Sequence, residues 1–115
     1  MPKFPIVYLE LPSNNVATCK QFYHSLFEWS FQDYGPDYAA FSNSGLDGGF
    51  NGATPAEGRS KFPLAVIDCE DLEAMEKRIV AAGGRITLPI FSFPGGRRSH
   101  FIDPSGNELA VMQKE

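Results

Sequence analysis

The chain has little positive charge. Ten Lys and Arg residues stand against 14 Asp and Glu residues among its 115 amino acids, and the formal net charge is -4. Nucleic acids and anionic membrane surfaces attract clustered Lys and Arg side chains. The sequence contains no such cluster, so we expect neither nucleic acid nor a membrane as a partner.

Long apolar runs and paired cysteines are also missing. No apolar run reaches the roughly 18 residues of a membrane-spanning helix, and no apolar stretch follows a basic start. The two cysteines, Cys19 and Cys69, lie far apart in apolar surroundings. Such cysteines are usually buried free thiols in a reducing compartment. We therefore expect a cytoplasmic protein with no disulfide.

The sequence instead contains one pattern twice. An alternating strand-like run is followed by an Asn or Asp that can cap a helix, Asn15 in the first half and Asp71 in the second. Three short strand-like runs follow each helix. The expected elements are strands near 6–11, 29–34, 38–42 and 46–51 with a helix from 16, then strands near 64–69, 85–91, 98–102 and 108–113 with a helix from 72.

This pattern predicts an α+β fold. It consists of two β-α-β-β-β modules whose curved half-sheets surround a cavity, within a single domain covering 1–115. Module 1 covers 1–52, a linker without periodicity covers 53–61, and module 2 covers 62–115. Antiparallel strands after the first helix exclude a dinucleotide-binding unit, in which strands and helices keep alternating.

Three segments of the sequence resemble those of a known family. They are the capped helix Asn15–Phe27, the second capped helix Asp71–Gly84, and the turn and strand Asp103–Met112. In this order they resemble the vicinal-oxygen-chelate superfamily, which includes glyoxalase I, extradiol dioxygenases and bleomycin-resistance proteins. The chain is most similar to a small bacterial branch described as glyoxalase-related.

The resemblance implies a metal site, and it identifies the positions in this sequence that correspond to the metal ligands. Enzymes of the superfamily hold a divalent metal with His, Gln and Glu side chains from four strands. The corresponding positions here are Tyr8, Gly49, Leu64 and Ala110. The chain has only two histidines, and one of them, His24, lies on the first expected helix. The resemblance therefore implies that the usual metal site is lost and that no cofactor is needed.

Relocated ligands remain an alternative. Strand alternation places Tyr8, Glu10, His100 and Glu108 on the cavity side. One His and two carboxylates can hold a divalent transition metal at a non-standard site. The same His100 and Glu108 can instead act as an acid-base pair without a metal.

We therefore keep three functions open. The favoured hypothesis is a metal-free protein that binds a small, partly apolar or aromatic molecule between its half-sheets. The others are a lyase, isomerase or dioxygenase-type enzyme, and an interaction scaffold without a ligand. We also expect a homodimer, because open half-sheets expose edges and apolar surface. The candidate ligand-binding residues are Tyr8, Glu10, Phe50, Phe91, Phe93, Arg98, His100, Glu108, Ala110 and Met112.

Overall fold

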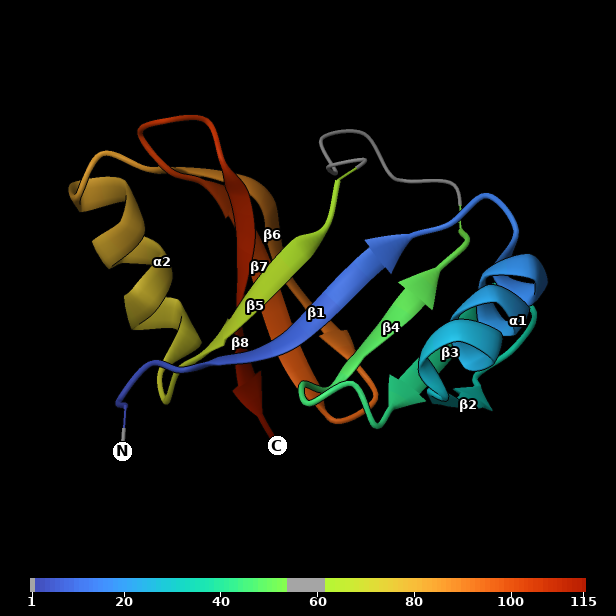
Figure 1. The fold of residues 1–115 in the computed structure, drawn as a ribbon. Coiled ribbons are helices and arrows are strands. Elements are labelled where there is room, and N and C mark those ends of the chain that lie inside the picture. The colour runs from blue at the N-terminus through green and yellow to red at the C-terminus, as the bar shows by residue number, and fades with distance from the viewer. Residues whose placement is uncertain (1, 54–61) are drawn as a thin grey trace.

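A computed structural model describes residues 2–53 and 62–115 (Figure 1). Each half of the chain forms one strand, one helix and three further strands. The first half contains β1 (Ile6–Pro12), α1 (Val16–Phe27), β2 (Ser30–Asp33), β3 (Tyr38–Ser42) and β4 (Gly48–Asn51). The second contains β5 (Leu64–Asp68), α2 (Leu72–Ala81), β6 (Arg85–Phe93), β7 (Gly96–Ile102) and β8 (Glu108–Lys114).

All the strands belong to one mixed sheet. Its order is β2-β3-β4-β1-β5-β8-β7-β6. β1 runs parallel to β4 and β5 runs parallel to β8, and the two halves join edge to edge through the antiparallel pair of β1 and β5. The predicted α+β fold with two β-α-β-β-β modules is therefore confirmed. Most of the expected linker lies outside the described residues.

Both helices begin at the predicted caps. The Asn15 side chain accepts a hydrogen bond from the Thr18 backbone N–H, and the Asp71 side chain accepts one from Ala74. Each bond satisfies an N–H group that the first helical turn leaves without a partner. α2 is followed by Gly83 at a φ of +102°, a left-handed conformation that suits glycine.

The two helices lie on the same side of the sheet, one near each end. α1 packs on β3 and β4, and α2 packs on β6, β7 and β8. We call this helix-bearing side the outer face and the opposite side the inner face. Under α1 lies an aromatic core around Phe41 and Phe50, and under α2 lies a core around Leu72 and Val111.

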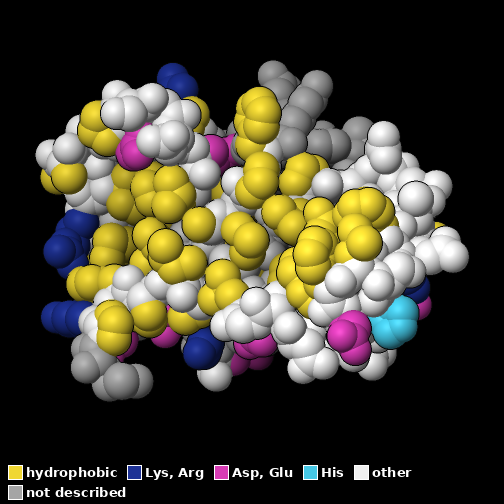
Figure 2. Space-filling view, viewed as in Figure 1, with side chains coloured by type: hydrophobic (Ala, Val, Ile, Leu, Met, Phe, Trp, Pro, Cys, Tyr) yellow, Lys and Arg dark blue, Asp and Glu magenta, His cyan; other side chains and the backbone are white. Residues whose placement is uncertain are grey.

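Neither helix packs extensively against β1 or β5, the two middle strands. Figure 2 shows hydrophobic side chains gathered across the middle of the molecule, where these strands run in Figure 1. Ile6 of β1 is 54% exposed, and Phe4 and Leu46 are also exposed. A continuous apolar patch on a protein surface often marks a site of contact with another molecule.

Neither described helix is long and apolar enough to cross a membrane.

Candidate functional site

The inner face has an apolar floor. Leu64, Val66 and Ala110 are buried there, and Tyr8 and Met112 pack against them. The strand register explains this grouping, because Tyr8 pairs with Val66 and Val66 with Ala110. Ala110 in turn pairs with His100. One row of residues thus crosses four strands, with polar side chains at its two ends.

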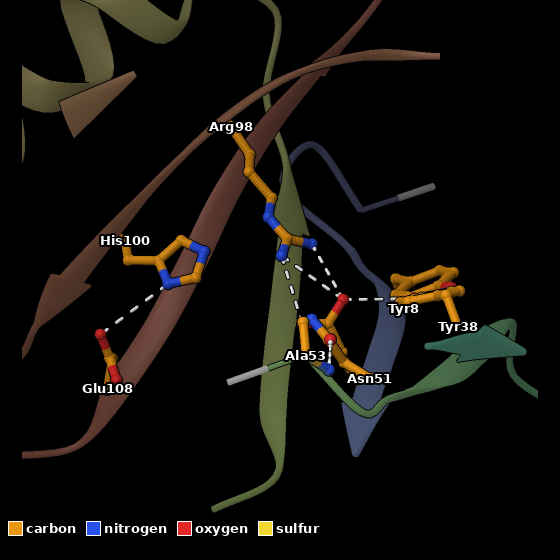
Figure 3. A network of polar contacts seen from close by, with 8 residues as sticks. Tyr8, Tyr38, Asn51, Ala53, Arg98, His100 and Glu108 are labelled. Atoms are coloured by element: carbon orange, nitrogen blue, oxygen red, sulfur yellow. Dashed lines mark hydrogen bonds and ion pairs between the residues drawn. The ribbon is translucent and has the colours of Figure 1, made fainter. Parts of the chain in front are cut away.

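An ion pair crosses this row diagonally. Arg98 of β7 reaches Glu10 of β1, with a distance of 3.2 Å from Nη2 to Oε1 (Figure 3). Strands β8 and β5 lie between β7 and β1, so the contact requires a strongly curved sheet. Both side chains are only 11% exposed. The guanidinium also lies over the rings of Phe91 and Phe93, at 5.4 and 5.7 Å from their centroids.

Two tyrosines and an asparagine complete the surroundings of Glu10. The Tyr38 hydroxyl donates to Glu10 Oε2 over 3.2 Å, and the Asn51 amide donates to Oε1 over 3.3 Å. The Tyr8 and Tyr38 hydroxyl oxygens are 2.5 Å apart. Burial raises the pKa of Tyr38 well above its usual value of 10.0, and the Glu10 carboxylate raises it further. Burial also raises the pKa of Tyr8. Both phenols therefore keep their protons at neutral pH.

These pKa shifts predict a loss of stability in alkali. The unfolded chain releases the two protons near pH 10, whereas the folded chain holds them to higher pH. The stabilisation is present below pH 10 and disappears as the pH rises through the folded-state values. We expect Tyr38→Phe to reduce this alkaline loss in denaturant titrations at pH 8 to 11, with the exposed Tyr34→Phe as the control. An equal alkaline loss in both variants would contradict the assignment.

A second polar cluster lies at the other end of the row. His100 Nδ1 is 3.8 Å from Glu108 Oε2, and the two side chains are 3% and 8% exposed. The Thr87 hydroxyl donates to the same Glu108 oxygen over 2.8 Å. The Phe91 ring lies 5.8 Å from the imidazole between ring centroids. A nearly buried imidazole and a carboxylate are thus held side by side.

The structure brings most of the candidate residues to this face. The two clusters and the floor contain Tyr8, Glu10, Phe91, Phe93, Arg98, His100, Glu108, Ala110 and Met112. Ala110, however, is 0% exposed, so in this conformation it contacts neighbouring side chains and no open space.

Phe50 does not belong to the site, and its assignment to the cavity was wrong. It is 2% exposed and packs in the outer core under α1, near Tyr23 and Phe41. Because alternate residues of a strand face opposite sides, the outward position of Phe50 turns Asn51 inward. Asn51, Tyr38 and Thr87 are the polar residues that the sequence alone did not reveal.

The positions that correspond to the superfamily's metal ligands are filled or apolar. A Cβ atom at Gly49 would lie 2.6 Å from both Cε1 and the hydroxyl oxygen of Tyr38, so no carboxylate fits there. Leu64 and Ala110 belong to the apolar floor. In the part of the chain that the structure describes, no three His, Cys, Asp or Glu side chains are grouped to hold a metal ion. These residues do not fit the family's metal.

Comparison with known proteins agrees with the fold. A family model described as the Glyoxalase/Bleomycin resistance protein/Dioxygenase superfamily matches residues 6–111. The chain belongs to this superfamily. Among curated relatives, a putative glyoxylase, CFP32, of Mycobacterium bovis is 26% identical over 115 residues. The alignment covers 92% of this chain and 44% of the relative, so this chain spans less than half of that protein's length.

Solved structures share the fold at low identity. A glyoxalase/bleomycin resistance protein/dioxygenase superfamily member from Vibrio splendidus aligns with a TM-score of 0.69 and 16% identity, covering 97% of this chain and 99% of that one. A Legionella pneumophila protein described as an NAD-dependent benzaldehyde dehydrogenase aligns with a TM-score of 0.74 and 16% identity, covering 94% and 98%. At such identity these likenesses establish only the architecture of the superfamily member.

Proposed function

We propose that this superfamily member binds a small, partly apolar or aromatic molecule on the inner face of its sheet, without a metal. One observation carries the proposal. Glu10, Arg98, His100 and Glu108 are gathered on one face with side-chain exposures of 11% or less. Burying ionisable groups costs free energy, and such groups cluster at functional sites.

The apolar floor supplies the second half of a ligand site. Most small-molecule sites combine apolar walls with a few convergent polar groups. Here the floor of Leu64, Val66 and Met112 lies between the Glu10 cluster and the His100–Glu108 pair. The Phe91 and Phe93 rings beside Arg98 extend the apolar surface at one side.

A ligand screen tests this function. The protein is heated with a metabolite library, and we expect a small set of partly apolar compounds to raise its melting temperature, because a ligand that binds only the folded state stabilises it. The same compounds should lose their effect on Glu108→Gln and keep it on Glu70→Gln, an exposed control. Stoichiometric metal in protein purified without chelator would contradict the metal-free proposal.

A second function is favoured by one contact. The 3.8 Å approach of His100 to Glu108 places two proton-transfer groups together on the inner face. We propose, as the alternative, an enzyme that moves a proton on a carbonyl-containing substrate. His100→Gln would then abolish turnover of a compound found in the screen while leaving its binding intact. If no compound binds, the third function, a scaffold without a ligand, is supported instead.

We also propose that the chain forms a homodimer through its outer face. Neither helix packs extensively against the middle strands β1 and β5, and Ile6 of β1 and the preceding Phe4 remain exposed. A second copy can cover this apolar surface. We expect light scattering at about 100 μM, where even weak dimers form, to give twice the chain mass, and Ile6→Lys to return the mass to one chain. A monomer at that concentration would contradict the proposal.

A further inference from the structure

The hydrogen-bond chain at Glu10 fixes the direction of each proton. A phenol has a single O–H to donate. The Tyr38 hydroxyl donates its hydrogen bond to Glu10 Oε2, which also accepts hydrogen bonds from Arg98. The short contact between the tyrosines must then use the proton of Tyr8. The Tyr8 oxygen has no second proton, so toward a ligand it can only accept a hydrogen bond.

Glu108, at the other side of the floor, is also a hydrogen-bond acceptor. Thr87 donates its hydroxyl proton to Glu108 Oε2. No hydrogen bond to Glu108 Oε1 is formed within residues 2–53 and 62–115, and this oxygen is not among the fully buried polar atoms without a partner. An ionised carboxylate only accepts hydrogen bonds. The Tyr8 oxygen and Glu108 Oε1, on opposite sides of the apolar floor, are therefore both acceptors that suit a hydrogen-bond donor on the ligand.

The charges of the inner face point the same way. Arg98 is already paired with Glu10, and its remaining Nε atom is fully buried. His100 is the basic group next to Glu108. A ligand carboxylate would lie near Glu10, whose charge Arg98 already neutralises, and near Glu108 on the other side of the floor. Like charges at short distance repel. An amine or a hydroxyl meets no such opposition.

We propose, resting on the proposed binding function, that the inner face selects an uncharged or cationic molecule with an apolar body and hydroxyl or amine donors. Tyr38 is the specificity-determining residue, because its oxygen accepts the hydrogen bond that Tyr8 could otherwise donate to a ligand. The ligand class is therefore a small aromatic or aliphatic alcohol or amine. A carboxylate or an acceptor-only ether offers no donor to Tyr8 or to Glu108, so the direction of these hydrogen bonds disfavours both.

Four small probes that share a phenyl ring and differ in their polar group test the selection. Benzylamine, benzyl alcohol, benzyl methyl ether and benzoate are titrated at millimolar concentration into the isotope-labelled protein, and amide shifts are followed by NMR. We expect benzylamine and benzyl alcohol to bind at least fivefold more tightly than the ether and benzoate, the factor that one hydrogen bond of about 1 kcal/mol gives. Benzoate or the ether binding as tightly as the alcohol would overturn the inference.

Two variants separate selection from a structural effect. Tyr38→Phe removes the oxygen that accepts the hydrogen bond from Tyr8. Tyr8 can then donate to a ligand, so the ratio of alcohol to ether affinity should fall at least threefold. Tyr8→Phe should remove the contact and lower the affinity for both donors, whereas the exposed Tyr34→Phe should change neither. An unchanged ratio in a folded Tyr38→Phe protein contradicts the role of Tyr38.

Failure of this inference differs from failure of the proposed function. If a library compound binds and it is an anion or an acceptor-only molecule, the function stands and the inferred ligand class is wrong. If neither the probes nor any library compound binds, the proposed function is wrong, and the ligand class with it.

Discussion

Replacing Arg98 with Met should lower the free energy of unfolding by about 3 kcal/mol, because it leaves a mostly buried carboxylate without its cation. Glu10 is 11% exposed, and once the guanidinium is removed Tyr38 and Asn51 are its only donors among residues 2–53 and 62–115. Met keeps the apolar part of the side chain over Phe91 and Phe93. Urea unfolding at neutral pH measures the change.

The neighbouring arginine provides a matched control. Arg97 also forms an ion pair, with Glu73, but the Glu73 side chain is 58% exposed. Exposed ion pairs contribute little to stability, so Arg97→Met should change the free energy of unfolding far less than Arg98→Met does. Adding Glu10→Gln to Arg98→Met should recover much of the loss, since no unpaired charge then remains. Equal costs for the two arginine variants would show that Glu10 does not depend on Arg98.

Gly49→Ala should destabilise the protein by about 2 kcal/mol, within the range for forcing extra atoms into packed space. The added Cβ would lie 2.6 Å from the Tyr38 ring and hydroxyl. Moving the ring would break its hydrogen bonds to Tyr8 and Glu10. The change is measured by urea unfolding of each single variant.

The double variant isolates the cause. In a Tyr38→Ala background the ring is absent, so Gly49→Ala should cost much less than it does in the original chain. The difference between the two costs is the coupling energy of a double-mutant cycle. If the cost is the same in both backgrounds, Tyr38 does not fill the space beside position 49.

Local rules predicted the fold because each acts over a few residues. The caps Asn15 and Asp71 start helices where their side chains accept backbone N–H groups, and both are visible in the sequence. The strands follow from alternation. The assignment of inner and outer sides worked for β8, where Val111 faces the α2 core and Ala110 the inner floor.

The sequence of β4 does not show which of its side chains face inward, because the strand is short and has little polar–apolar pattern. Its sequence, Gly48-Gly49-Phe50-Asn51, has no polar residue before Asn51 to fix its sides. The abundance of Phe in the sequence favours Phe50 as a cavity residue, whereas in the structure it completes the aromatic core under α1. That prediction leaves out Asn51, and with it Tyr38, which is its partner on β3. The correct side of one residue would have revealed two site residues.

The contact between Arg98 and Glu10 could not be predicted from the sequence. The two residues lie 88 positions apart, and two strands separate them in the sheet. Whether their side chains meet depends on the curvature of the whole sheet, which no local pattern specifies. The sequence identified both residues as candidates and left their pairing open.

The edge-to-edge joint between β1 and β5 has the form of an internal twofold axis. The caps Asn15 and Asp71 are 56 residues apart, which makes Tyr8 equivalent to Leu64 and Glu10 to Val66. Across the joint, Tyr8 pairs with Val66, Glu10 with Leu64, and Leu9 with its own equivalent, Ala65. The backbone at the centre of the inner face is therefore nearly symmetric, while the side chains are polar on one side and apolar on the other. For a ligand at the proposed site, the two orientations that the backbone alone would allow are therefore not equivalent, because each half of the site offers different side chains.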